Sequence, residues 1–295
     1  MTDWPPLPLE AWRDTYATLH MWTQVVGKVS LALTPRTNHF WNVAMHVTSR
    51  GLEAKPIVTG DRALTMSFDF IRHELVLHCS DGGTEVIALE PRTVADFHAA
   101  FMDALGRLRM DVHIWTMPTE VPDPIRFEAD TIHRTYVPEQ ANAVWRALLA
   151  MQPVFETFRA RFIGKCSPVH FWWGAFDVSV TRFSGRRAPE RPGADSITRE
   201  SYSHEVISHG FWPGGGTMPE AVFYAYAAPE PDGLRDVTVR PNAARYDDKL
   251  REFILPYEAV RTAASPEREL MDFLESTYEQ AARLAKWNRG ELERV

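Results

Sequence analysis

The sequence has only two cysteines, Cys79 and Cys166, among its 295 residues. Each lies in a segment whose pattern predicts a β-strand, so we expect two buried thiols in a reducing compartment and no cysteine metal cluster. No apolar run reaches the length of a membrane-spanning helix. The opening residues, MTDWPPLPLEAW, also lack the charged and apolar regions of a signal peptide. These absences predict a cytoplasmic protein with no membrane segment.

Blocks of like charge are absent as well. The formal net charge is −7, and a nucleic-acid surface usually appears as a basic stripe, so we expect no nucleic-acid partner. The glycine run at residues 214–216 is not followed by the Lys-Ser/Thr of a phosphate-binding loop. His204-Glu205 is followed by Ser208 where a zinc protease would carry its second histidine. The sequence therefore names no metal ligands, and it leaves open whether a metal binds and which cofactor, if any, is used.

Two segments of the chain resemble each other. Residues 25–51 and 161–186 both contain Gly-Lys, then Ser, then His-Phe-Trp, then a run that ends in Val-Thr. The first copy is six residues longer between the glycine and the histidine, and length differences of this kind concentrate in loops. This order of shared features indicates an internal duplication. Coincidence in a tryptophan-rich chain is the alternative.

The hydrophobic periodicity predicts helices and antiparallel strands in each half. In the first half we expect a helix that ends at Gly27, a strand over 39–47, a meander of strands over 66–70, 75–79 and 86–89, a helix from Thr93, and a strand over 111–116. In the second half we expect a helix over 138–162, strands over 168–183, 201–209, 221–227 and 250–255, and a terminal helix from Ser265.

This order predicts the α+β class, with two related halves packed as one compact unit, each built as helix, antiparallel strands, helix. Residues 1–116 form the first predicted half, and residues 131–295 form the second. Residues 117–130 contain Pro118, Pro122 and Pro124 and show no periodicity, so we interpret them as a proline-rich link.

Several stretches resemble a bacterial family of uncharacterised proteins, a domain of unknown function. They are WPPLPLEAWRDTYATLH, RFIGKCSPVHFWWGAFDVSVTRFSGR, SHEV and GFWPGGG. The resemblance covers nearly the whole chain. It implies a bacterial cytoplasmic protein, but it implies no reaction, cofactor or catalytic residue.

Three side chains are candidates for catalysis. His39 and His170 each open one copy of the repeated His-Phe-Trp strand, and an imidazole at the rim of an apolar face suits proton transfer or metal binding. A histidine satisfied by the backbone at a strand end is the alternative reading. Glu205 shares a strand face with His209 and would supply a carboxylate.

The candidate ligand-binding residues are aromatic or basic. Trp41, Trp172 and Trp212 would line a pocket, and one of the adjacent pair Trp172-Trp173 is expected at an interface or cleft. Lys28 and Lys165 follow the two glycines and would bind an anion, although a cation also favours a helix C-terminus. Arg182 would meet a carboxylate elsewhere in the chain.

These residues support two hypotheses, and the sequence does not decide whether the protein is an enzyme. In the first, a small molecule binds in a pocket between the halves that is lined by His, Trp and Glu. If the protein is an enzyme, this pocket would carry out a hydrolase-type or acid–base reaction. In the second, the protein is a non-catalytic interaction module that uses exposed Trp173, Phe211 and Trp212. The oligomeric state is left open by both.

Overall fold

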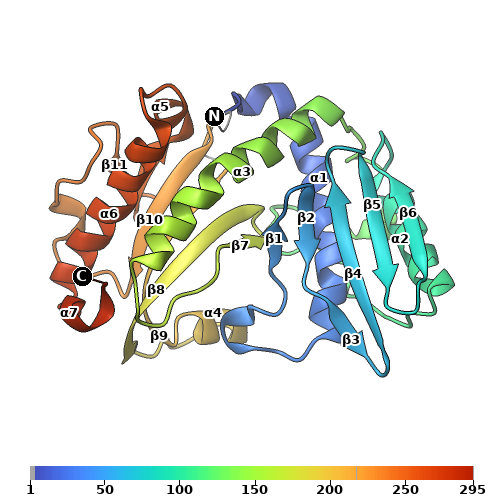
Figure 1. Ribbon diagram of the computed structural model, residues 1–295, viewed down its shortest axis with the longest axis horizontal. Helices are drawn as coiled ribbons and strands as arrows, with labels where there is room; N and C mark the ends of the chain where they lie inside the picture. Colours follow the sequence, from blue (N-terminus) through green and yellow to red (C-terminus); the bar gives the residue numbers. More distant parts are fainter. Residues whose placement is uncertain (1–3, 217, 295) are drawn as a thin grey trace. The chain divides into compact units, whose positions relative to one another are not determined.

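The computed structural model describes residues 4–216 and 218–294. The chain divides into two compact units. We call one the α1 unit, which comprises Glu10–Leu149 and Phe171–Asp177. The other is the α6 unit, which comprises the described parts of 1–9, 150–170 and 178–295. Both units combine helices with antiparallel strands, which confirms the α+β class (Figure 1).

The α1 unit contains an antiparallel sheet. Its main strands pair in the order β1, β2, β4, β5 and β6, while β3 pairs with β4, and Phe171 of β7 pairs with Met45 of β1. The strands are β1 (Met45–Val47), β2 (Gly51–Ala54), β3 (Ile57–Thr59), β4 (Arg62–Asp69), β5 (Glu74–Cys79), β6 (Thr84–Ala88) and β7 (His170–Trp172). Leu75, Leu77 and Cys79 are buried along one face of β5, so the predicted meander is confirmed.

Two long helices, α1 (Leu9–Leu33) and α2 (Val94–Arg107), lie behind the strands of this unit in Figure 1. The start of α2 is where the sequence predicts it, because the Thr93 side chain accepts a hydrogen bond from the Asp96 backbone N–H. Phe97, Phe101 and Leu105 are fully buried on its inner face. Two short 3₁₀ turns complete the unit, η1 (Asn38–Phe40) and η2 (Phe127–Ala129).

Helix α3 (Pro138–Ala160) begins in the α1 unit and ends in the α6 unit. The antiparallel sheet of the α6 unit has the order β8, β9, β10, β12 and β11, and a bulge interrupts the pairing of β8 with β9 between Phe183 and Arg187. Its strands are β8 (Asp177–Arg187), β9 (His204–Trp212), β10 (Val222–Ala228), β11 (Arg245–Asp247) and β12 (Glu252–Pro256).

Helix α6 (Pro266–Leu284) packs against β9 and β10 in this unit. It begins with a proline after Ser265, as the sequence predicts, and it buries Leu270, Phe273 and Leu274. The shorter helices of the unit are α4 (Ser196–Ser201), η3 (Leu234–Asp236), α5 (Tyr257–Arg261) and α7 (Arg289–Leu292).

Four predicted elements differ from the structure. The single strand predicted over 168–183 is two strands, β7 and β8, separated by a turn in which Phe176 has a φ of 58°. Helix α1 does not end at Gly27 but continues to Leu33. The predicted strand over 39–47 is a strand only from Met45 to Val47, because His39 and Phe40 have φ values of 58° and 56°, a left-handed backbone that an extended strand excludes. Residues 111–116 form no regular strand.

Candidate functional site

Two predicted site residues of the α1 unit, His39 and Trp41, lie in or directly after the 3₁₀ turn η1. His39 is buried, and its ring centre lies 5.5 Å from that of Trp41. The Trp41 backbone carbonyl accepts a hydrogen bond of 3.0 Å from Lys55 Nζ. Trp172 ends β7 and is half-buried. His39 thus opens a turn and not a strand, and it packs against the neighbouring tryptophan.

Glu205, the predicted catalytic carboxylate, is held by two partners. Arg186 donates to Glu205 Oε2 from Nε at 2.9 Å and from Nη2 at 2.7 Å, and Ser184 Oγ donates to the same oxygen at 2.8 Å. Arg186 also donates to the backbone carbonyls of Ala285 and Lys286, just after α6. This network connects the β8–β9 hairpin to the end of α6, so the contacts of Glu205 are those of a structural ion pair.

The other predicted residues of the α6 unit are dispersed. His170 is fully buried at the start of β7, whereas Lys165 is exposed with its ammonium 4.9 Å from the Phe183 ring centre. Trp212 packs against an apolar cluster that includes Met218. Glu205 and Trp212 lie near opposite ends of β9, seven residues apart, which corresponds to roughly 23 Å. These two side chains therefore do not line one small pocket.

Arg182 is 1% exposed and lies among aromatic rings. Its guanidinium carbon is 3.5 Å from the Phe158 ring centre, 4.2 Å from Tyr278 and 5.1 Å from Phe162, and Nη2 donates to the Phe158 carbonyl. Burial lowers the pKa of Arg182. Burial, and then the charge of Arg182, keep the pKa of His209 well below its usual value. The sequence predicts a carboxylate partner for Arg182. The charges of Glu275 and Glu293 act on it, while the groups packed directly against the guanidinium are aromatic rings.

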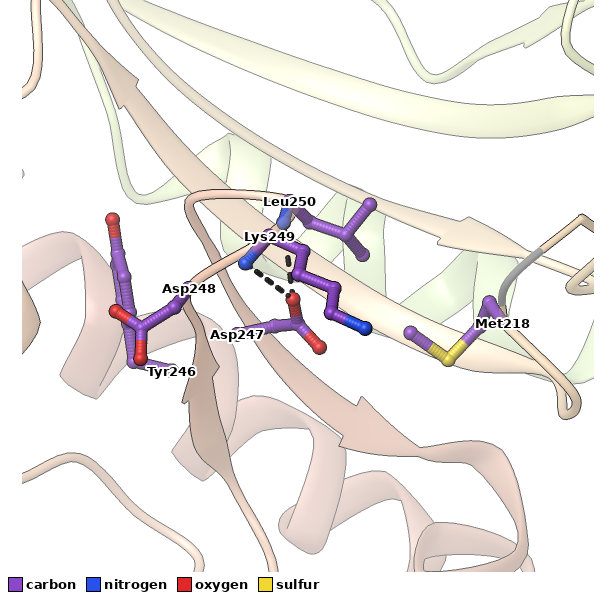
Figure 2. Close-up of a pocket in the computed structure, with 6 residues that line it drawn as sticks. All are labelled: Met218, Tyr246, Asp247, Asp248, Lys249 and Leu250. Atoms are coloured by element: carbon purple, nitrogen blue, oxygen red, sulfur yellow. Dashed lines mark hydrogen bonds between the residues drawn. The ribbon is translucent and has the colours of Figure 1, made fainter.

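The α6 unit has a cavity of about 280 Å³ beside β11 (Figure 2). Figure 2 shows the Lys249 side chain extending alongside the Asp247 carboxylate, while Asp247 Oδ1 accepts the backbone N–H groups of Lys249 and Leu250. A second cavity of about 460 Å³ lies in the α1 unit and is lined by Asp61, Arg62, Ser80, Asp81 and Arg109. None of the eight predicted site residues lines either of these two cavities.

A row of polar side chains on α1 forms the strongest candidate site. His20, Gln24 and Lys28 follow each other at four-residue spacing, which places them on one face of the helix. His20 Nε2 donates to the Gly174 carbonyl at 2.8 Å, and Gln24 Nε2 donates to the Thr119 carbonyl at 2.9 Å. This row faces two irregular segments of the α1 unit, the turn after β7 and the chain after Thr116.

Lys28 is the unusual member of the row, since only 3% of its surface is exposed. Its Nζ lies 5.9 Å from the Trp173 ring centre and 6.0 Å from that of Phe127, at the outer limit of cation–π attraction. Among residues 4–216 and 218–294, no hydrogen bond or ion pair reaches this ammonium, although its nitrogen is not among the polar atoms that are completely shielded from solvent. Burial lowers the pKa of Lys28 to about 8.

Residues 117–130 cover this row. Gln24 Oε1 accepts the Thr119 backbone N–H at 2.8 Å while its Nε2 donates to the Thr119 carbonyl, so one amide side chain holds both polar groups of one backbone residue. Phe127, at the other end of the segment, contributes one of the two rings beside Lys28. The predicted link between the halves is therefore part of the α1 unit, where it packs over the polar row.

The outer end of the row has a different electrostatic character. Burial lowers the pKa of His20 to about 4, so its imidazole is neutral at physiological pH. Glu120 has a positive φ of 57°. Its carboxylate lies against Gly174, since a Cβ atom added to that glycine would be 3.3 Å from it. Desolvation there raises the pKa of Glu120, although the residue as a whole is exposed. The row thus passes from a neutral imidazole near the surface to a buried amine.

A model of a family of unknown function, DUF5996, matches residues 4–294. The chain belongs to this family. The match agrees with the resemblance noted in the sequence, and family membership assigns no reaction. Searches of curated proteins and of solved structures gave no match.

Two further features bear on the class of this DUF5996 member. Within the described part of the chain, no helix combines the length and apolar character that crossing a membrane requires. The same residues bring together no group of three or more His, Cys, Asp or Glu side chains able to hold a metal ion.

The sequence predicts a solvated environment for Lys28, which differs from the buried one in the structure. The Gly27-Lys28 pair suggested a helix end, where a lysine would be solvated near the last carbonyl groups. The helix instead continues, and Trp173 occupies the space that Gly27 leaves open. The four-residue spacing of His20, Gln24 and Lys28 was the available signal, because three polar groups on one face of a helix that is otherwise rich in buried residues need partners.

Proposed function

We propose that this protein binds a small molecule at the polar row of the α1 unit, and that oxygen atoms of the ligand accept hydrogen bonds from the Lys28 ammonium. The observation that carries this proposal is the burial of Lys28 without a hydrogen-bonding or charged partner among the described residues. An ammonium has three N–H donors, and burying it unpaired is costly. A carboxylate, phosphate or carbonyl oxygen of a ligand would satisfy them.

The magnitudes support a ligand over a purely structural role. Lowering the pKa of Lys28 from 10.5 to about 8 corresponds to at most roughly 3 kcal/mol that the folded state loses when the group is charged, and to less once solvent screening of the ammonium is counted. Cation–π contacts at the limit of their range contribute about 0.5–1 kcal/mol each where they are exposed to solvent, and more only when close and desolvated. Unusual burial of this kind is concentrated at functional sites.

Access to Lys28 would require the covering segment to move. Two features favour this movement over a rearrangement of the sheet. Residues 117–130 have no helix or strand apart from the short turn η2, and few hydrogen bonds hold the segment to α1, chiefly those of Gln24 with Thr119, which would have to break for it to open. Loops that cover sites commonly open in this way.

The alternatives from the sequence have less support. Proton transfer by His39, His170 and Glu205 requires a free carboxylate, whereas Glu205 is bound by Arg186 and Ser184. The interaction module requires exposed aromatic residues, but Trp173 is 5% exposed and Phe211 is fully buried. Each is packed within its own unit, Trp173 against Gly27 and Phe211 against Phe223.

The proposal is tested by NMR of protein labelled with ¹³C at the lysine Cε positions. The sequence has five lysines, so each signal can be assigned by single substitutions. We expect one signal, absent in Lys28→Met, to titrate near pH 8 and to shift when acetate, oxalate or inorganic phosphate is added. The Lys249 signal serves as the exposed control. A Lys28 signal that titrates near pH 10.5 and ignores all three anions contradicts the proposal.

A further inference from the structure

Lys28 differs from an ordinary cation site in being an amine that can lose its proton. Five of the 32 basic residues of the chain are lysines, and the other deeply buried cation, Arg182, is an arginine. A guanidinium stays charged under all physiological conditions and stacks better on aromatic rings. A lysine at position 28 therefore supplies something that an arginine would not, namely an unprotonated nitrogen with a free electron pair.

We propose that Lys28 forms a covalent imine with an aldehyde or ketone ligand that enters between Trp173 and Phe127. This inference rests on the proposed function, since the same site must first admit the ligand. It names the class of ligand as a carbonyl compound. The geometry that supports it is a buried amine flanked by two aromatic rings, with no carboxylate paired to it among the described residues.

Absence of a paired carboxylate matters for the reaction. A salt bridge would hold the nitrogen in its protonated form, which cannot attack a carbonyl carbon. With a pKa of about 8, roughly one-tenth of the Lys28 side chains are unprotonated at pH 7, compared with fewer than about one in a thousand for a solvated lysine. The neutral amine is thus available at physiological pH.

The step balances without any further reactant. The Lys28 nitrogen forms a bond to the carbonyl carbon, and the carbonyl oxygen takes up the proton that the nitrogen loses, which gives a carbinolamine. The carbon–oxygen bond then breaks, and the oxygen leaves with the remaining nitrogen proton as one molecule of water. No oxidant or reductant is needed to reach the imine.

The surroundings also suit the product. A protonated imine carries the same positive charge as the ammonium, so the faces of Trp173 and Phe127 can stabilise both. The planar carbon–nitrogen double bond would fit beside two flat rings. Burial would protect the imine from hydrolysis once the segment 117–130 covers it again.

Reductive trapping tests this inference. The purified full chain is incubated at pH 7 with glyoxylate, a small aldehyde that carries a carboxylate, in the presence of sodium cyanoborohydride. Peptide mass mapping then measures the carboxymethyl adduct at each of the five lysines. We expect Lys28 to be labelled at least about tenfold faster than the exposed Lys249. The reason is that the unprotonated fraction of Lys28 at pH 7 exceeds that of a solvated lysine.

Two variants make the result decisive. Lys28→Met removes the fast-labelled peptide and leaves labelling of Lys249 unchanged. Gln24→Ala releases Thr119 from the helix, so we expect it to accelerate labelling of Lys28 and not of Lys249. Labelling of Lys249 with none at Lys28, in both the parent protein and Gln24→Ala, overturns the imine.

The two proposals can fail separately. If anions shift the Lys28 NMR signal but no adduct forms, Lys28 binds an acidic ligand and the covalent inference is wrong. If the Lys28 signal titrates as a solvated lysine and no adduct forms, both proposals are wrong. If the adduct forms at Lys28 and acetate slows its formation, both are supported.

Discussion

Gly27 provides the space that the Trp173 indole occupies. A methyl group at Gly27 would lie 2.3 Å from Trp173 Cδ1, closer than any real contact. The indole cannot easily yield, because its Nε1 donates a hydrogen bond of 2.9 Å to the Val43 carbonyl. A glycine in the middle of α1 is therefore required by packing, and the same packing places Trp173 beside the Lys28 ammonium.

Gly27→Ala is expected to destabilise the protein, against the usual rule for helices. Alanine inside a helix normally gains up to about 1 kcal/mol over glycine. Here the forced displacement of Trp173 costs more, since overpacking a core costs about 1–3 kcal/mol. We expect a net loss of about 1–2 kcal/mol in the free energy of unfolding, measured by urea denaturation.

Gly106→Ala is the matched control for this substitution. Gly106 also lies within a helix, α2, and an added methyl group there would have no neighbour within 4 Å. We expect this variant to gain about 0.5–1 kcal/mol. If both variants change stability in the same direction, the contact between Gly27 and Trp173 does not explain the glycine.

The fold was predictable where the signals are local. The meander of β4, β5 and β6 follows from alternation along each strand, and the start of α2 follows from Thr93 and Asp96, a cap formed within one turn. The end of α1 was not predictable, because the reason for Gly27 is a tryptophan far away in the sequence. A glycine after an amphipathic helix is usually a C-cap, and sequence alone does not distinguish the two roles.

The candidate site was less predictable than the fold. His39 follows a strand-like alternation, but the left-handed backbone at His39 and Phe40 makes a turn, which depends on tertiary contacts. Arg182 is predicted to meet a carboxylate, and the charges of Glu275 and Glu293 do act on it. The sequence does not indicate the three rings, from α3, the chain after it and α6, that pack against the guanidinium. Burial of a cation depends on which distant segments pack over it, and the periodicity of a single helix or strand does not indicate which segments these are.

Arg182→Ala is expected to cost about 2–4 kcal/mol of stability. The substitution removes a side chain that packs against Phe158 and Tyr278, leaves a cavity, and removes a donor to the Phe158 carbonyl. Urea denaturation followed by circular dichroism measures the loss. Arg13→Ala is the control, because Arg13 is exposed and paired only with the exposed Glu10, so we expect a change below about 0.5 kcal/mol. Equal effects of the two substitutions would show that the aromatic surroundings of Arg182 contribute nothing.

Lys28→Met is expected to stabilise the protein at pH 7. Methionine fills a similar volume without a charge to desolvate, and the lowered pKa sets the cost of that charge at no more than roughly 3 kcal/mol before solvent screening is counted. Part of that gain is offset by the lost cation–π contacts, so we expect an increase of about 1–2 kcal/mol. An increase in stability at the expense of a binding site is a common trade-off.

Lys55→Met is the control for Lys28→Met. Lys55 is half-buried, and its Nζ donates a hydrogen bond to the Trp41 carbonyl, so its removal should lower stability by about 0.5–1.5 kcal/mol. Differential scanning calorimetry of both variants beside the parent protein measures the two changes. A loss of stability in Lys28→Met as large as that in Lys55→Met would show that the Lys28 ammonium is a satisfied structural group.

The stability difference between Lys28→Met and the parent protein is expected to depend on pH. Lys28 has a pKa of about 8 in the folded state and 10.5 in the unfolded state, so between these values the unfolded parent protein binds more protons than the folded one. Its stability relative to the variant must therefore rise with pH across this window. Below pH 8 the amine is charged in both states and the advantage of the variant is constant, and by about pH 10.5 that advantage has largely vanished. Urea denaturation of both proteins at pH 7, 8, 9 and 10 measures the convergence, and parallel curves over this range would show that Lys28 titrates alike in both states.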